Sequence, residues 1–229
     1  MHLRIGSSTF FCTYVLPALL QAFHELYPQV TFSFTERRTA ELFEGLKNGE
    51  LDLLLEAECT DNPMFCSEAF ATEEIVLAVP SEHPINQKIS GYGYTFEEFL
   101  RRNQPNGCKP AIPLSVFNQE GFIMLTKDND LYSRILSICK NASFCPKTLF
   151  SVYQMITAYN LVCDGVGISF LRSTIPGYVS PTDQIMFYQL DDPLAVRSIY
   201  LTRLQKRSSK IQQALFDFLI EHRVCPEKS

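Results

Sequence analysis

Apolar positions in the N-terminal third of the chain follow two periods, one of two residues and one of three to four. The first period predicts β-strands and the second predicts amphipathic helices. The order is strand, helix, strand, helix, strand, with expected spans of residues 2–6, 11–26, 30–34, 39–46 and 51–55. Pro17 lies inside the first expected helix and is expected to kink it. Apolar strands separated by helices favour a parallel sheet covered on both faces.

The same order recurs further along the chain. Strands are expected at 122–125, 149–152 and 168–171, with helices around 131–138 and 155–163. Residues 86–119 between the two patterns predict loops and one short helix at 96–100. Further strands are expected at 74–79, 186–190 and 199–204, and a terminal helix at about 208–222 that docks on the first sheet.

These patterns predict an α/β fold of two Rossmann-like lobes with a central cleft. We expect the first lobe to contain residues 1–80 and 191–229, and the second to contain 81–190. In open parallel sheets, ligands bind beyond the carboxyl ends of the strands. The residues that follow those strands are therefore the candidates for a binding site.

Hydroxyl and cationic side chains gather at these strand ends. Hydroxyls and free N–H groups at helix starts bind anions well, because unpaired donors and the positive end of the helix dipole meet there. An alternative is that Ser8, Thr9 and Thr39 are only N-caps of their helices. The candidate set is Ser7, Ser8, Thr9, Phe10, Arg38 and Thr39 in the first lobe, and Thr126, Lys127, Tyr153 and Gln154 in the second.

Composition narrows the function classes. The 229 residues are 46% hydrophobic and 20% charged, which is typical of a globular protein. No stretch approaches the roughly 18 to 20 apolar residues of a membrane span, and no leader is expected.

The net charge of −5 argues against DNA binding by this chain alone. The first expected lobe holds 11 Lys and Arg against 17 Asp and Glu (−6), and the second holds 9 against 8 (+1), which favours pairing of opposite lobes in two copies.

Catalytic and metal-binding patterns are sparse. The eight cysteines contain no C-x-x-C pair, so we expect reduced thiols of a cytoplasmic protein with no metal and no cofactor. None of the four histidines lies at a strand end, no G-x-S-x-G turn occurs, and Glu36 is the one base expected in the cleft. We therefore expect a binding protein rather than an enzyme.

Several short motifs, in their order and spacing, resemble the effector-binding domain of LysR-type transcriptional regulators. The similarity covers nearly the whole chain, and residues 110–122 depart from it as a longer insertion. The motifs are Leu3-Arg-Ile-Gly-Ser-Ser, Val15-Leu-Pro, Tyr27-Pro, Leu46-Lys-Asn-Gly-Glu-Leu-Asp-Leu, His83-Pro, Phe122-Ile-Met-Leu and Gly165-Val-Gly-Ile-Ser-Phe.

The resemblance implies a periplasmic-binding-protein-like (type 2) fold with a small-molecule effector in the cleft, an organic anion or a zwitterion. It also implies antiparallel homodimers and an N-terminal winged helix-turn-helix, absent from this chain, through which alone DNA is bound. We expect the first helix, Phe10 to Tyr27, to pack against the partner's second lobe, because its aromatic residues exceed the needs of one buried stripe. Phe10 departs from the family pattern, where a small hydroxyl residue is frequent. The alternative is an extracytoplasmic solute-binding protein of the same fold.

Overall fold

The computed structural model describes residues 1–104, 107–206 and 209–223, and the chain divides into two units. Unit 1 contains Met1–Thr72 and the chain from Arg197 onward, whereas unit 2 contains Glu73–Val196. The boundaries thus differ from the expected 80/81 and 190/191. They fall within or beside long strands, which the sequence pattern had assigned to single lobes.

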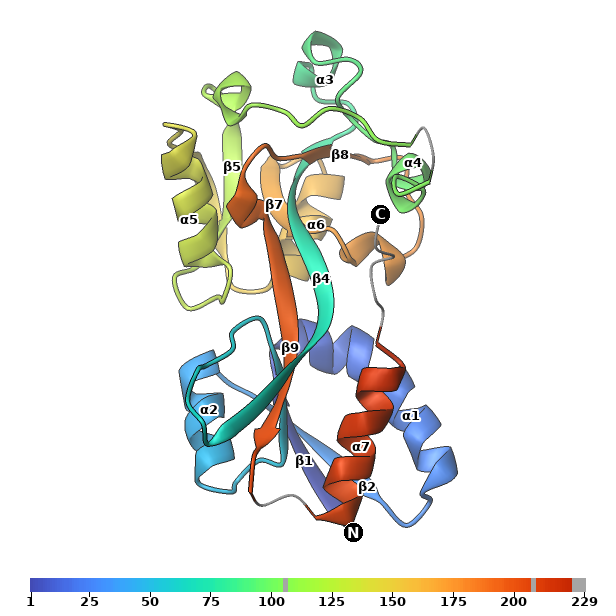
Figure 1. Cartoon of the computed structure of the whole chain (residues 1–229). Helices are drawn as coiled ribbons and strands as arrows, with labels where there is room; N and C mark the ends of the chain where they lie inside the picture. The colour runs from blue at the N-terminus through green and yellow to red at the C-terminus, as the bar shows by residue number, and fades with distance from the viewer. Residues whose placement is uncertain (105–106, 207–208, 224–229) are drawn as a thin grey trace. The chain divides into compact units, whose positions relative to one another are not determined.

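Unit 1 is a mixed sheet with helices on both sides (Figure 1). Its strands lie in the order β2-β1-β3-β9-β4, where β1 is parallel to β2 and β3, and β9 is antiparallel to β3. The expected parallel sheet is therefore correct for three strands and wrong for the strand that returns from unit 2. The elements are β1 (His2–Ser7), α1 (Leu16–Leu26), β2 (Thr31–Glu36), α2 (Thr39–Lys47), β3 (Leu53–Glu56), the first part of β4 (Phe65–Pro80), β9 (Val196–Leu204) and α7 (Lys210–Glu221).

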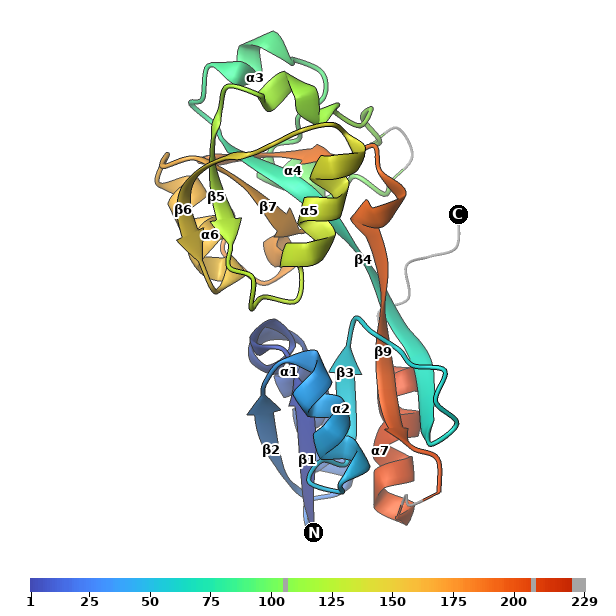
Figure 2. The ribbon, with the colours of Figure 1, turned by 90° about the vertical axis from the view of Figure 1, so that its left-hand side faces the viewer.

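Alternation along β3 builds two cores in unit 1. Leu53 and Leu55 pack with residues of α1 and α7, including Phe23 and Leu215, whereas Leu54 packs against α2. Figures 1 and 2 show α1 and α7 on one side of this sheet and α2 on the other. The predicted docking of the terminal helix on the first sheet is confirmed for residues 210–221, while Ser208 lies outside the described residues.

The first helix differs from its expected form. It contains a π-helical turn, η1 (Phe11–Val15), in which the N–H of Leu16 donates to the carbonyl of Phe11. Pro17 lies at the start of α1, directly after this turn. Proline lacks an N–H and clashes with the preceding turn of an α-helix, so the wider turn absorbs the irregularity where a kink was expected.

The aromatic residues of this helix are mostly in the core, which corrects the sequence-based reason for an interface there. Phe11 and Phe23 are buried, and Phe10 and Tyr27 pack against the same core. Phe23 stacks on Tyr27 with ring centroids 4.6 Å apart. The first helix carries many aromatic residues because the core that they fill also extends to α7.

Unit 2 repeats the pattern with its own mixed sheet. Strand β5 is parallel to β6 and β7, and β4 is antiparallel to β7 and β8. Helix α6 packs on β5, β6 and β7, and α5 lies on the other side of these strands (Figure 2). The elements are α3 (Ile85–Lys88), α4 (Phe96–Leu100), η2 (Leu114–Phe117), β5 (Gly121–Leu125), α5 (Tyr132–Asn141), β6 (Lys147–Val152), α6 (Met155–Cys163), β7 (Ile168–Arg172), η3 (Ile175–Gly177), β8 (Ile185–Gln189) and η4 (Pro193–Ala195).

Strand β4 is much longer than the expected 74–79, and this changes the charge distribution. Four acidic residues near the chain crossings, Glu73, Glu74, Asp191 and Asp192, belong to unit 2. Unit 1 then holds 11 Lys and Arg against 13 Asp and Glu (−2), and unit 2 holds 9 against 12 (−3). The charge asymmetry expected between the lobes is therefore wrong.

Among the described residues, no helix has the length and apolar character needed to cross a membrane.

Candidate functional site

The carboxyl ends of β1, β2 and β3 bring together the predicted residues of unit 1. The strands are in register, with Ser7 opposite both Glu36 and Leu55. Ser7 is fully buried and donates its hydroxyl hydrogen bond to the carbonyl of Leu55. Ser7 therefore joins two strands, and its hydroxyl is already used within the sheet. We call Ser7, Ser8, Glu36, Thr39 and Glu56 the carboxyl-end face of unit 1.

Ser8 is the residue directly after β1, at the start of the first helix. Its carbonyl accepts a hydrogen bond from the N–H of Cys12 at 3.1 Å. Its hydroxyl oxygen is buried and has no hydrogen-bond partner among the described residues. A buried hydroxyl without a partner costs about 1–3 kcal/mol, so the interpretation of Ser8 as an ordinary N-cap does not account for its side chain.

Thr39 begins α2 but does not cap it, which corrects one alternative from the sequence. The N-cap is Arg38, whose backbone is extended, and Thr39 is the first helical residue. The Thr39 hydroxyl donates to Oε2 of Glu56 at 3.0 Å. Glu56 ends β3 and is only 3% exposed. This buried carboxylate was not among the predicted residues.

The other predicted residues of unit 1 surround this face. Thr9 follows Ser8 in the first helical turn, and Arg38 is exposed at the start of α2. Phe10 packs partly against the core, with its ring 5.3 Å from that of Tyr14 and 5.6 Å from that of Phe11. Phe10 therefore contributes an aromatic surface rather than a polar contact.

In unit 2, Thr126 is the residue directly after β5, as Ser8 is after β1. Its N–H donates to the carbonyl of Val152 at 2.9 Å, which joins the ends of β5 and β6. Its hydroxyl oxygen is buried and, like that of Ser8, lacks a hydrogen-bond partner in the described parts of the chain. Lys127 is exposed next to it.

Tyr153 and Gln154 lie between β6 and α6. Gln154 is the N-cap of α6, and its carbonyl accepts from the N–H groups of Thr157 and Ala158. Tyr153 is 51% exposed, and its carbonyl accepts a hydrogen bond from the side chain of Asn129 at 2.9 Å. The structure thus brings all four predicted residues of unit 2 to the same end of β5 and β6.

A buried ion cluster completes this end of unit 2. Arg172 ends β7, and its side chain is 3% exposed. It contacts Oε1 of Glu73 at 2.6 Å and Oδ2 of Asp130 at 2.9 Å. We call Thr126, Lys127, Tyr153, Gln154 and Arg172 the carboxyl-end face of unit 2. Arg172 and Glu56 were missed, although each directly follows an apolar strand, the signal used to find the other candidates.

The face of unit 1 has a negative local field. Burial raises the pKa of the Cys12 thiol to about 12, and the charges of Glu36 and Glu56 add to this effect. A carboxylate field that disfavours a thiolate also favours a cationic or hydrogen-bond-donating group nearby. No group of three or more His, Cys, Asp and Glu side chains in the described ranges could hold a metal ion.

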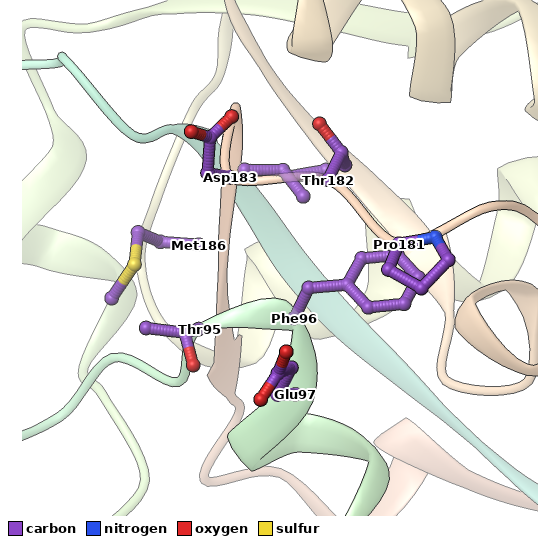
Figure 3. A pocket seen from close by; sticks show the side chains of 8 residues that line it. Thr95, Phe96, Glu97, Pro181, Thr182, Asp183 and Met186 are labelled. Carbon is purple, nitrogen blue, oxygen red and sulfur yellow. The ribbon is translucent and has the colours of Figure 1, made fainter.

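A separate pocket lies elsewhere on unit 2 (Figure 3). Strand β8 places Ile185 beside Pro80 at the end of β4, whereas Arg172 lies beside Ile75, earlier on the same strand. The pocket is therefore distant along β4 from the carboxyl-end face. In Figure 3, Asp183 and Thr182 line one side and Thr95 and Glu97 the other; its full lining is Thr95, Phe96, Glu97, Pro181, Thr182, Asp183, Ile185 and Met186.

Two α/β units joined by two chain crossings, each with polar groups at the carboxyl ends of its parallel strands, define a two-lobed ligand-binding α/β protein. The family model described as the LysR substrate binding domain matches residues 1–223. The chain belongs to this family, and the predicted resemblance and fold class are confirmed.

Several relatives of the chain are named as regulators of transcription. The chain is 26% identical over 201 residues to the "Probable hydrogen peroxide-inducible genes activator" of Streptomyces viridosporus, covering 87% of this chain and 58% of that protein. It is 21% identical over 218 residues to the "DNA-binding transcriptional dual regulator OxyR" of Escherichia coli K12, covering 93% and 65%. The chain thus spans less than two thirds of the length of these relatives.

Solved structures share the fold. The effector binding domain of QuiR in complex with shikimate superposes with a TM-score of 0.72 at 21% identity, covering 97% of both chains. The regulatory domain of CcmR from Synechocystis PCC6803 in complex with 2-PG gives 0.78 at 18% identity, covering 98% of this chain and 99% of that one. Both likenesses show the fold of this chain.

Proposed function

We propose that this domain binds a small organic anion or zwitterion through the carboxyl-end faces of its two units, and that binding controls transcription by a longer regulator. The observation that carries the proposal is the pair of buried hydroxyls, Ser8 and Thr126, at equivalent positions after the first parallel strand of each unit, β1 and β5. Neither has a hydrogen-bond partner in the described residues. A polar ligand supplies the missing partners. The expected cleft arrangement stays a prediction.

The charges around the faces favour a zwitterion. Lys127 and Arg38 are exposed cations that attract a carboxylate, and the positive dipole end of each helix start acts in the same direction. Glu36 and Glu56 at the face of unit 1 suit an ammonium or hydroxyl group instead. A compound that carries both kinds of group satisfies both requirements.

We propose that this domain is one part of a longer regulator. The relatives are longer and are named as DNA-binding regulators or gene activators. We propose that DNA is bound by a separate N-terminal domain and that the protein works in the cytoplasm. The relatives' names also favour a regulator over an extracytoplasmic solute-binding protein.

The test combines stability and binding. A thermal-shift screen of small carboxylic acids and amino acids identifies ligands, because selective binding to the folded state raises the melting midpoint. Calorimetry then compares the wild type with Ser8→Ala, Thr126→Val and the control Ser115→Ala, which removes an exposed hydroxyl from η2.

The two effects of removing an orphan hydroxyl have opposite signs. Without ligand, Ser8→Ala leaves stability unchanged or raises it by up to about 1 kcal/mol, because an unsatisfied polar group is removed. With ligand, the affinity falls about tenfold, the loss expected for one hydrogen bond of about 1.4 kcal/mol. If Ser8→Ala and Thr126→Val bind every ligand as tightly as Ser115→Ala does, the site assignment fails.

We also propose a homodimer in which the first helix of one copy packs against unit 2 of the other. Strands β2 and β6 are the outer strands of their sheets, and all residues of β6 except the last are exposed. Leu149 and Phe150 on β6 are 48% and 50% exposed. On unit 1, Leu26 at the end of α1 is 64% exposed. Exposed apolar area on outer strands favours association between copies.

Sedimentation at micromolar concentration tests this arrangement. The wild type is expected as a dimer, and Leu26→Glu and Phe150→Glu each as a monomer, because each places a charge in an apolar interface. The matched control for Phe150→Glu is Leu100→Glu, since Leu100 is also 50% exposed but lies on α4. A monomeric wild type, or dimers in both variants, would refute the interface.

A further inference from the structure

Arg172 contacts three separate segments of unit 2 at the carboxyl end of β7. Its guanidinium pairs with Glu73 on β4 and with Asp130 in the turn between β5 and α5. Its backbone N–H donates to Sδ of Met155, the first residue of α6, at 3.1 Å. We propose that Arg172 is a positioning residue that couples the loop of residues 126–131 to the middle of β4, where unit 2 begins.

The loop of residues 126–131 has two anchors on its neighbours. Asn129 donates from its side-chain amide to the carbonyl of Tyr153, and its Oδ1 accepts from the N–H of Leu131. The second anchor is Asp130, which offers both carboxylate oxygens to one guanidinium nitrogen of Arg172, at 2.9 and 3.2 Å. The side chain of Asp130 is 18% exposed, so it is the member of the cluster nearest to solvent.

The other side of the cluster is the middle of β4, where the chain passes from unit 1 into unit 2. Glu73 is the first residue of unit 2, its side chain is 2% exposed, and its Oε1 lies 2.6 Å from Arg172. The next residue, Glu74, donates its N–H to the hydroxyl of Ser173 at 3.0 Å and accepts from the N–H of Ser173 at 2.8 Å. Strand β4 continues along the chain into unit 1.

Burial makes these contacts interdependent. Separating a buried arginine from one carboxylate leaves charge in a site that water reaches poorly, and breaking such a pair costs about 3–5 kcal/mol. A displacement of Asp130 is therefore accompanied by a movement of Arg172, which shifts Glu73 and the end of β7. The coupling rests on the proposed function in one respect, because a ligand bound at Thr126 and Lys127 would displace the loop.

Hydrogen exchange of the whole chain without ligand tests the coupling itself. Asp130→Asn removes the charge and keeps the shape, and Asp183→Asn is the control, an acid removed from unit 2 at the far end of β4. In Asp130→Asn we expect the amides of Leu131 and Glu74 both to exchange about tenfold faster, the effect of weakening one hydrogen bond to a charged group. The control leaves both rates unchanged.

Acceleration confined to Leu131, with Glu74 unchanged, would overturn the proposal, and so would no acceleration at either amide. Arg172→Lys provides a second test, because lysine keeps the charge but lacks the planar fork that reaches two carboxylates. It is expected to accelerate both amides as Asp130→Asn does, and unchanged rates contradict the coupling. Because no ligand is present, failure here leaves the proposed function standing, and failure of ligand binding leaves this result standing.

Discussion

The two units share one pattern of strands and helices but place their ionic contacts at opposite ends of their sheets. In unit 1, Asp52 precedes β3 and binds Arg4 on β1, with Oδ1 of Asp52 at 2.9 Å from the guanidinium. Gln212 of α7 donates to the same oxygen at 2.6 Å. In unit 2, the cluster of Arg172, Glu73 and Asp130 lies at the carboxyl end of β7.

The position of the ionic group separates a structural role from one at the site. The Arg4–Asp52 pair joins the start of β3 to β1 and α7, away from the strand ends where ligands bind. The Arg172 cluster lies at those strand ends, beside the loop that carries Thr126. Loss of the first pair is therefore expected to change stability alone, whereas loss of the second changes stability and ligand binding together.

The largest effect is expected from Arg172→Met. Removing the guanidinium takes a buried cation away from Glu73 and Asp130, so the free energy of unfolding is expected to fall by about 3–5 kcal/mol. Urea denaturation measures this. The control is Arg101→Met, which removes an exposed partner of Glu97, with side chains 69% and 75% exposed, and is expected to change stability by less than about 1 kcal/mol. Equal losses in the two variants would contradict the account.

A smaller, pH-dependent effect is expected from Asp52→Asn. Burial alone would raise the pKa of Asp52, but hydrogen bonds from Arg4 and Gln212 outweigh it and hold the pKa below its ordinary value. The stability from this depressed pKa is present above the ordinary value of about 3.9 and is lost as the pH falls through the folded-state pKa. The free energy of unfolding of the variant is expected to be about 2 kcal/mol lower at pH 7, and solvent screening at the 39% exposed Arg4 reduces this loss. The stability of the variant is also expected to fall less than that of the wild type when the pH is lowered. Unfolding at pH 7 and pH 3 measures both, and an unchanged acid dependence would count against the assignment.

Thr39→Val tests the buried carboxylate of unit 1. Valine keeps the shape of threonine but leaves Glu56 without the hydroxyl that donates to it, so the free energy of unfolding is expected to fall by about 1–2 kcal/mol. Thr39→Ser restores the donor and should recover most of that stability. A serine variant as unstable as the valine variant would show that the methyl group, and not the hydrogen bond, is what matters.

The smallest effect concerns the reactivity of the thiols. Burial raises the pKa of Cys12 and of Cys139 to about 12, so thiolate is scarce at neutral pH. In the folded protein, iodoacetamide is expected to modify the exposed Cys59, Cys108 and Cys145 first. Mass spectrometry of the labelled peptides checks the order, and early labelling of Cys139 would contradict it. Cys225 lies outside the described residues.

The sequence predicted the order of elements well because buried strands and amphipathic helices carry strong periods. The strand-end rule also found Ser8 and Thr126. The same rule applied to the third parallel strand of each unit, β3 and β7, would have found Glu56 and Arg172. These residues directly follow the apolar residues 53–55 and 168–171. These two residues were predictable in principle.

Other features depend on packing between distant segments and leave little trace in a local pattern. The ion cluster joins residues 73, 130 and 172, and no spacing rule relates them. The first part of β4 is mostly half-buried or exposed, so the strand was expected only from residue 74 and the unit boundary was placed too late. The burial of Phe11 and Phe23 likewise depends on α7, which is remote in the sequence.

The most direct test of the central claim is amide chemical-shift mapping with any amino acid or small acid that raises the melting midpoint. The account predicts that the largest shifts fall on both carboxyl-end faces, at residues 7–9, 38–40, 126–131 and 153–155, and on Arg172. Shifts concentrated instead at Thr95–Glu97 and Pro181–Met186, around the separate pocket of unit 2, would contradict it.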